Sequence, residues 1–155
     1  MPGLDILLAC AGHWTGINHL QVSPDAPGED SRSTLDVGLA LGGRFVHVDQ
    51  RWSYRGTVQQ GTLLLGFDPE SEVATIHWID TWHMGHKVMA CSGRLADNGG
   101  GIDARGTYAA PPGPDWGWRI AIDAVPKTRI DIHMFNINPA DGAEQVAVRG
   151  TFAPG

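Results

Sequence analysis

The chain alternates between apolar and polar residues in about ten runs, and turn-forming residues separate each run from the next. The separators are rich in Gly, Pro, Asp and Asn, which favour short connections and therefore antiparallel neighbours. A sheet of this many strands either splits into a sandwich or closes on itself, and closure removes the exposed edges. We therefore predict an all-β fold, a single antiparallel up-and-down barrel. The predicted strands are 13–22, 33–41, 44–54, 57–67, 72–82, 87–96, 102–109, 116–125, 128–137 and 144–153.

The length of 155 residues suits one domain, and we expect residues 1–155 to form it. The formal net charge of -6 argues against nucleic acid and anionic membranes as partners, because both are bound by clustered Lys and Arg. The first residues lack the basic and apolar regions of a signal peptide. No apolar run approaches the roughly 18 residues of a membrane span. These features predict a cytoplasmic protein, in which Cys10 and Cys91 are free thiols.

Two segments outside the strands are distinctive. Residues 4–11 have apolar side chains too dense for a half-buried strand, so we predict a short N-terminal helix that closes one end of the barrel. The longest polar connection, residues 23–32, is the expected flexible lid.

Strand alternation predicts which side chains face the barrel interior. The predicted inner face is mostly apolar, but it also carries Asn18, Gln50, Asp80 and Asn136, and a buried polar group needs a partner or a ligand. Because tryptophans on this face can wall a cavity, we predict a ligand site there. Its expected residues are Gln50, Trp52, Trp78, Asp80, Trp82, Trp118, Met134 and Asn136. The other residues expected inside are Leu35, Val37, Leu39, Leu41, Val46, Val48, Ile76, Trp116, Ile120, Ile122, Ile130 and Ile132, whereas Arg119, Asp123, Asp131 and His133 are expected outside.

Asp80 lies in the densest cluster of chemical groups, residues 78–86. In one interpretation, Asp80 binds a hydrogen-bond donor or an amine of the ligand, or acts as a general base. The other gives it a structural role, capping a turn or pairing with Arg51 or Arg55. A one-residue slip in the strand would instead turn Asp80 outward and His77 and His83 inward.

Other chemistry has less support in the sequence. His83 and His86 flank a turn and would need a third ligand, Asp80 or His47, to hold a metal, so no metal site is predicted. There is no Gly-x-Ser-x-Gly nucleophile motif and no phosphate-binding glycine loop, so no catalytic residue is predicted.

The pentad Gly12-His13-Trp14-Thr15-Gly16 resembles the opening signature of the calycin group, which includes the lipocalins. That resemblance implies that Trp14 plugs the narrow end of the barrel and that Arg149, near the end of the last strand, packs over it. The motifs around 43–46, 64–68 and 77–80 resemble an uncharacterised bacterial family with a lipocalin-like barrel of ten strands.

The nitrobindin-like haem barrels share the opening pentad. Resemblance to them implies a haem iron ligated by a histidine near the C-terminus. Residues 146–155 contain no histidine, and the last one, His133, lies about a strand earlier. Haem binding is therefore not the preferred expectation.

The preferred hypothesis is non-catalytic binding of a small, largely apolar or aromatic organic molecule, without a cofactor. Three alternatives remain: a haem or porphyrin carrier, an enzyme using Asp80 as acid or base, and a structural or dimerising barrel. A homodimer would use the outward apolar residues Ile79, Phe135 and Ile137.

Overall fold

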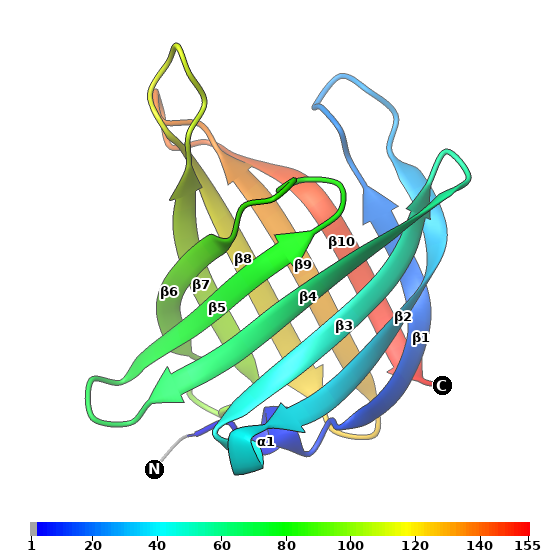
Figure 1. Cartoon of the computed structure of the whole chain (residues 1–155), viewed down its shortest axis with the longest axis vertical. Helices are drawn as coiled ribbons and strands as arrows, with labels where there is room; N and C mark the ends of the chain where they lie inside the picture. The colour runs from blue at the N-terminus through cyan, green and yellow to red at the C-terminus, as the bar shows by residue number, and fades with distance from the viewer. Residues whose placement is uncertain (1–2) are drawn as a thin grey trace.

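The computed structural model describes residues 3–155 and contains a closed antiparallel barrel of ten strands (Figure 1). Each strand pairs with the next along the chain, and β1 pairs with β10 to close the sheet. The fold predicted from the alternating runs is therefore confirmed. The strands are β1 (Gly12–Leu20), β2 (Glu29–Ala40), β3 (Phe45–Tyr54), β4 (Thr57–Asp68), β5 (Val73–Asp80), β6 (Met89–Leu95), β7 (Gly101–Tyr108), β8 (Trp116–Val125), β9 (Arg129–Ile137) and β10 (Glu144–Pro154).

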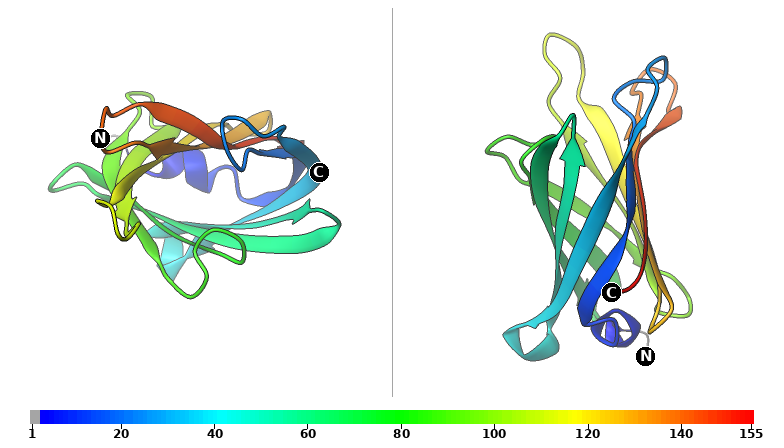
Figure 2. Two further views of the ribbon diagram at one scale, coloured as in Figure 1. Left: turned by 90° about the horizontal axis from the view of Figure 1, so that it is seen from above. Right: turned by 90° about the vertical axis from the view of Figure 1, so that its right-hand side faces the viewer.

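The N-terminal helix α1 (Asp5–Leu8) lies across one end of the barrel (Figure 2). It is shorter than the predicted 4–11, and the chain then turns at Gly12, whose φ of 138° is unfavourable for other residues, into β1. Trp14 is buried, and its Nε1–H donates to the carbonyl of Cys10 at 2.8 Å. Trp14 thus ties β1 to the chain that follows the helix. Within residues 3–155 no helix is long and apolar enough to cross a membrane.

The opposite end of the barrel carries five connections, which leave β1, β3, β5, β7 and β9 (Figure 1). The connection after β5 is the segment 81–88, which we call the β5–β6 loop. The predicted lid is shorter than expected, because β2 already begins at Glu29. The ligand pocket described below lies at this end.

Burial follows the predicted alternation along most strands. Val46, Val48, Gln50 and Trp52 are all buried, as expected for the inner face of β3. Leu39 and Leu41 are exceptions, with exposed fractions of 53% and 75%. Alternation does not bury them because they lie where β2 leaves the barrel and enters the short helix η1 (Leu41–Gly43).

The predicted packing of Arg149 over Trp14 is wrong. Trp14 is opposite Pro154 in the β1–β10 ladder, whereas Arg149 is opposite His19, five positions further along. At about 3.3 Å per residue, this separates the two by roughly 16 Å along the strand. Arg149 is exposed on the outer face, and a bulge between Val146 and Val148 shifts the alternation of β10 just before it.

The expected outward apolar surface is only partly exposed. Ile79 has an exposed fraction of 47%. The ring of Phe135, however, is covered by the guanidinium of Arg119, which lies 4.2 Å from the ring centroid. Arg119 also bonds Glu144 on β10 and Asp103 on β7, so it joins strands across the outside of the barrel.

Candidate ligand site

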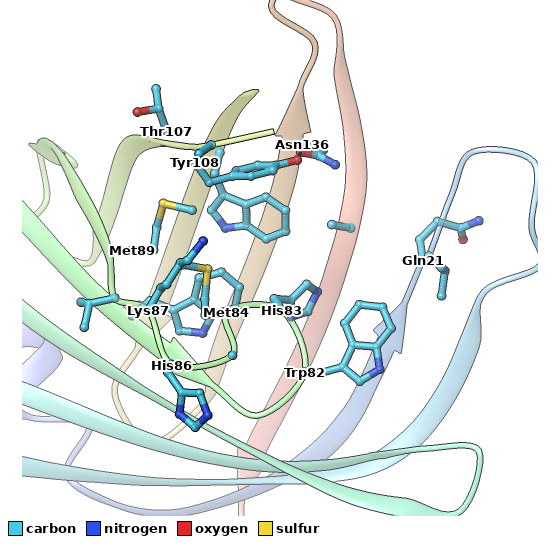
Figure 3. Close-up of a pocket in the computed structure, with 17 residues that line it drawn as sticks. Gln21, Trp82, His83, Met84, His86, Lys87, Met89, Thr107, Tyr108 and Asn136 are labelled. Atoms are coloured by element: carbon cyan, nitrogen blue, oxygen red, sulfur yellow. Dashed lines mark hydrogen bonds between the residues drawn. The ribbon is translucent and has the colours of Figure 1, made fainter. Parts of the chain in front are cut away.

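A pocket of about 820 Å³ lies at the end of the barrel opposite α1 (Figure 3). The β5–β6 loop forms one side of it, and residues from β6, β7, β8 and β9 form much of the rest. Trp78, Trp82 and Trp118 line it, together with Tyr108 and two methionines, Met84 and Met89. Aromatic and apolar side chains thus form a large part of the wall, which also carries the polar side chains of Gln21, His83, His86, Lys87, Thr107, Tyr108 and Asn136.

His83 stands at the centre of a group of four indole rings. The distances from its ring centroid are 4.7 Å to Trp82, 5.2 Å to Trp78, 5.5 Å to Trp118 and 6.2 Å to Trp52. Trp78 and Trp118 are themselves stacked, with centroids 5.3 Å apart and planes 12° from parallel. The imidazole is consequently enclosed on several sides, and only 13% of its side chain is exposed.

Asp80 fixes the position of His83. The carboxylate accepts hydrogen bonds from the backbone N–H groups of His83 at 2.6 Å and Met84 at 2.9 Å. Its other oxygen accepts from His83 Nδ1 at 2.5 Å. Asp80 is the last residue of β5 and its side chain is 2% exposed, so the acceptor is desolvated and aimed at the turn. It caps the turn, one of the two structural roles considered, and pairs with neither Arg51 nor Arg55 within residues 3–155.

The bond to Asp80 leaves the other ring nitrogen of His83 available. An imidazole whose Nδ1–H donates to a carboxylate carries its second nitrogen, Nε2, in a fixed direction. In the part of the chain that the structure describes, Nε2 makes no hydrogen bond, and His83 lines the pocket (Figure 3). This atom is the strongest candidate for contact with a bound molecule.

A second, smaller cavity lies on the inner side of His83. Its volume is about 10 Å³, close to the minimum for a single water molecule. Gln50 is bonded there, because its amide donates to Asn18 Oδ1 at 3.0 Å and to Ser33 Oγ at 3.3 Å. These polar side chains satisfy one another and do not reach the large pocket.

The eight residues predicted to bind a ligand are thus divided between two cavities. Trp78, Trp82, Trp118 and Asn136 line the large pocket, and Trp78 also borders the small one. Gln50, Trp52 and Met134 line only the small cavity, whereas Asp80 lines both the small cavity and a third hollow between β4 and the β5–β6 loop. His83 borders both the large pocket and the small cavity and separates them.

Two polar groups lie on the wall formed by β7, β8 and β9. Tyr108 donates its hydroxyl to Asn136 Oδ1 at 2.5 Å (Figure 3). Burial raises the pKa of Tyr108, and the bond to Asn136 partly opposes that change. The indole Nε1–H of Trp118 is buried, and it has no hydrogen-bond partner within residues 3–155. A bound molecule with an acceptor atom can satisfy this donor.

The ligand-binding residues predicted from the sequence do not include His83, Tyr108, Met84 or Met89. His83 was assigned to a turn, which is correct, but the turn folds inward. The sequence signal for the position of His83 is an Asp at a strand end followed three residues later by a His. Asp side chains commonly cap the next turn, so such an Asp can hold the His in place. Tyr108 and Met89 carried no comparable signal, since each is an ordinary residue at a strand end.

The histidines do not form a metal cluster. Between residues 3 and 155, no three His, Cys, Asp or Glu side chains are grouped so that they could hold a metal ion. His47 lies near Asp49 on the outer face, with 3.6 Å between Nδ1 and Oδ2. Cys10 and Cys91 are buried free thiols, and burial raises the pKa of Cys91 to about 11, which disfavours the reactive thiolate.

Comparison with known proteins identifies the family. The model of a family described as "Protein of unknown function (DUF1579)" matches residues 5–153. The chain belongs to this family. A search of curated proteins found no match.

Among solved structures, the DUF1579 barrel is similar to the "Crystal Structure of Rv2717c from M. tuberculosis". The TM-score is 0.67 at 12% sequence identity, and the alignment covers 100% of this chain and 98% of the other. At this identity the similarity concerns the fold alone.

Proposed function

We propose that this DUF1579 barrel is a calycin-type carrier that binds a small, largely apolar or aromatic organic molecule without transforming it. The observation that carries the proposal is the pocket of about 820 Å³, walled by Trp78, Trp82 and Trp118. This volume lies within the range of roughly 300 to 1,000 Å³ typical of small-molecule sites. A wall with several aromatic side chains suits an aromatic ligand.

Burial of apolar surface would supply the affinity. At about 25 cal/mol per Å², burying 300 Å² of apolar ligand surface gains roughly 7 kcal/mol before the entropic costs of association. The unpaired nitrogens of His83 and Trp118, two residues that line the pocket, would select the orientation of the ligand.

Native mass spectrometry with indole and naphthalene as probes tests the proposal. We expect one molecule of probe per barrel, and about tenfold weaker binding in Trp82→Ala, which removes a half-buried wall residue. The matched control is Trp116→Ala, because Trp116 is also half-buried but does not line the pocket. Absence of binding to both probes, or equal weakening by both variants, would contradict the proposal.

Haem binding is the second candidate, and it is supported by His83. A histidine that ligates a metal almost always donates its other ring N–H to a carboxylate or carbonyl, and Asp80 holds His83 in this way. Haem supplied to the protein would then give a Soret band that is lost in His83→Phe. A general acid or base role for Asp80 itself is less favoured, because three N–H donors occupy its carboxylate.

Two further expectations from the sequence stay predictions. These are the cytoplasmic location and the homodimer.

A further inference from the structure

We infer that the molecule bound in this pocket is a neutral phenol-like compound, an aromatic ring whose hydroxyl group contacts both His83 and Trp118. The inference rests on the proposed binding function and names the chemical class of its ligand. It is drawn from two nitrogen atoms that make no hydrogen bond within residues 3–155, Nε2 of His83 and the buried Nε1 of Trp118, and from the fact that both residues line the pocket.

The first atom is a proton acceptor in the neutral imidazole. Because Asp80 accepts the Nδ1–H of His83, the neutral ring carries its lone pair on Nε2. If the ring is instead protonated, Nε2 carries a proton and suits a phenolate oxygen. In both arrangements one proton lies between Nε2 and the ligand oxygen, so an acidic hydroxyl matches His83 in either state.

The second atom is a donor only. The Nε1–H of Trp118 is buried without a partner, and an unpaired buried donor costs free energy that a ligand acceptor can recover. The two rings are neighbours, with centroids 5.5 Å apart. A hydroxyl oxygen can accept from Trp118 while its proton is donated to His83. An ether or ketone only accepts, so it would leave Nε2 of the neutral imidazole unpaired, and an ammonium group only donates, so it would leave Nε1 of Trp118 unpaired.

Charge and shape restrict the class further. Asp80 is buried next to His83, so a carboxylate ligand would bring two negative charges close together. The basic side chain on the pocket wall, Lys87, is exposed and belongs to the β5–β6 loop (Figure 3). The remaining wall presents the rings of Trp82 and Tyr108 and the thioether of Met89, which suit the faces and edges of an aromatic ring.

The test compares 4-nitrophenol with 4-nitroanisole, which has the same ring and nitro group but a methyl ether in place of the hydroxyl. Dissociation constants are measured by isothermal titration calorimetry on the full chain, at a pH below the pKa of 4-nitrophenol so that its hydroxyl group stays protonated. We expect wild-type protein to bind 4-nitrophenol at least tenfold more tightly, since the ether lacks the proton for His83. In His83→Phe this preference should disappear.

Trp118→Phe provides the second variant, because it removes the N–H and keeps an aromatic ring in the core. It should weaken 4-nitrophenol binding severalfold, and near-ultraviolet circular dichroism verifies that each variant is folded. His77→Phe is the matched control, since His77 is exposed on the outer face of β5. It should leave both dissociation constants unchanged.

The outcomes separate the inference from the proposed function. If wild-type protein binds both compounds equally, the phenol inference is overturned while the carrier function stands. If the preference for 4-nitrophenol persists in both His83→Phe and Trp118→Phe, the inference is likewise overturned. If the protein binds neither these compounds nor indole and naphthalene, the carrier function itself is refuted.

Discussion

The carboxylate of Asp80 and the imidazole of His83 form one unit at the end of β5. Asp80 accepts the Nδ1–H of His83 at 2.5 Å and also two backbone N–H groups of the same turn. The carboxylate therefore both shapes the β5–β6 loop and aims the imidazole into the pocket. The stability of the turn and the geometry of the site depend on the same side chain.

Substitution of Asp80 tests whether its carboxylate stabilises the turn that carries His83. Asp80→Asn should lower the free energy of unfolding by about 1 to 3 kcal/mol, because one of three buried donors loses its acceptor. Urea denaturation measures the change. Asp36→Asn is the control, since it alters an exposed pair with His13 whose side chains are 50% and 60% exposed, and it should have little effect. Equal losses in the two variants would contradict the role assigned to Asp80.

Gly16, the last residue of the opening pentad, is required by the β1–β10 contact. A Cβ at this position would lie 1.9 Å from the backbone oxygen of Thr151. Gly16→Ala should therefore destabilise the barrel by more than about 4 kcal/mol or prevent folding, because the clash is with backbone. Thermal unfolding followed by circular dichroism measures the loss. Gly113→Ala, in an exposed loop where the nearest atom is 3.6 Å away, should be nearly neutral.

Cys91 makes stability fall at high pH. Burial raises its pKa from 9.0 to about 11, so the folded protein holds the thiol proton more tightly than the unfolded chain does. The contribution of the neutral thiol is complete below pH 9 and is lost as the pH rises through about 11. We expect the free energy of unfolding to fall by about 2 kcal/mol across this window from this group. Urea denaturation at each pH should show a smaller fall in Cys91→Ala; an unchanged fall would exclude Cys91 as its source.

Glu144 has the opposite pH dependence. Hydrogen bonding to the Arg119 guanidinium lowers its pKa, so its stabilising contribution is present at neutral pH. That contribution disappears as the pH falls through the lowered pKa of the folded state. Because the pair is partly exposed, Glu144→Gln should cost only about 0.5 to 1 kcal/mol at pH 7, and this cost should shrink as the pH falls through the lowered pKa of Glu144. Urea denaturation of the wild-type protein and the variant over this pH range measures the difference, and an equal cost at every pH would contradict the role assigned to Glu144.

Much of the barrel could be predicted from local patterns in the sequence. Alternation reflects the pleat of a strand, so the burial of Gln50, Trp78 and Asp80 could be predicted without knowing their neighbours. The same rule failed for Leu39 and Leu41, which lie at the end of β2 and in η1. In β10 a bulge before Val148 interrupts the alternation itself. A strand end and a bulge depend on the partner strand, which the pattern of one strand does not report.

The sequence by itself therefore determined the number of strands, their order of pairing and the aromatic character of the interior. Only the tertiary structure decided that the predicted ligand-binding residues line different cavities, and that His83 borders both the large pocket and the small cavity. It also decided that Arg149 lies far from Trp14. The physical reason is the distance along the chain over which each interaction acts. Strand alternation and turn chemistry act over a few residues, whereas the inward fold of the β5–β6 loop depends on indoles from β3, β5 and β8 that meet only when the barrel closes.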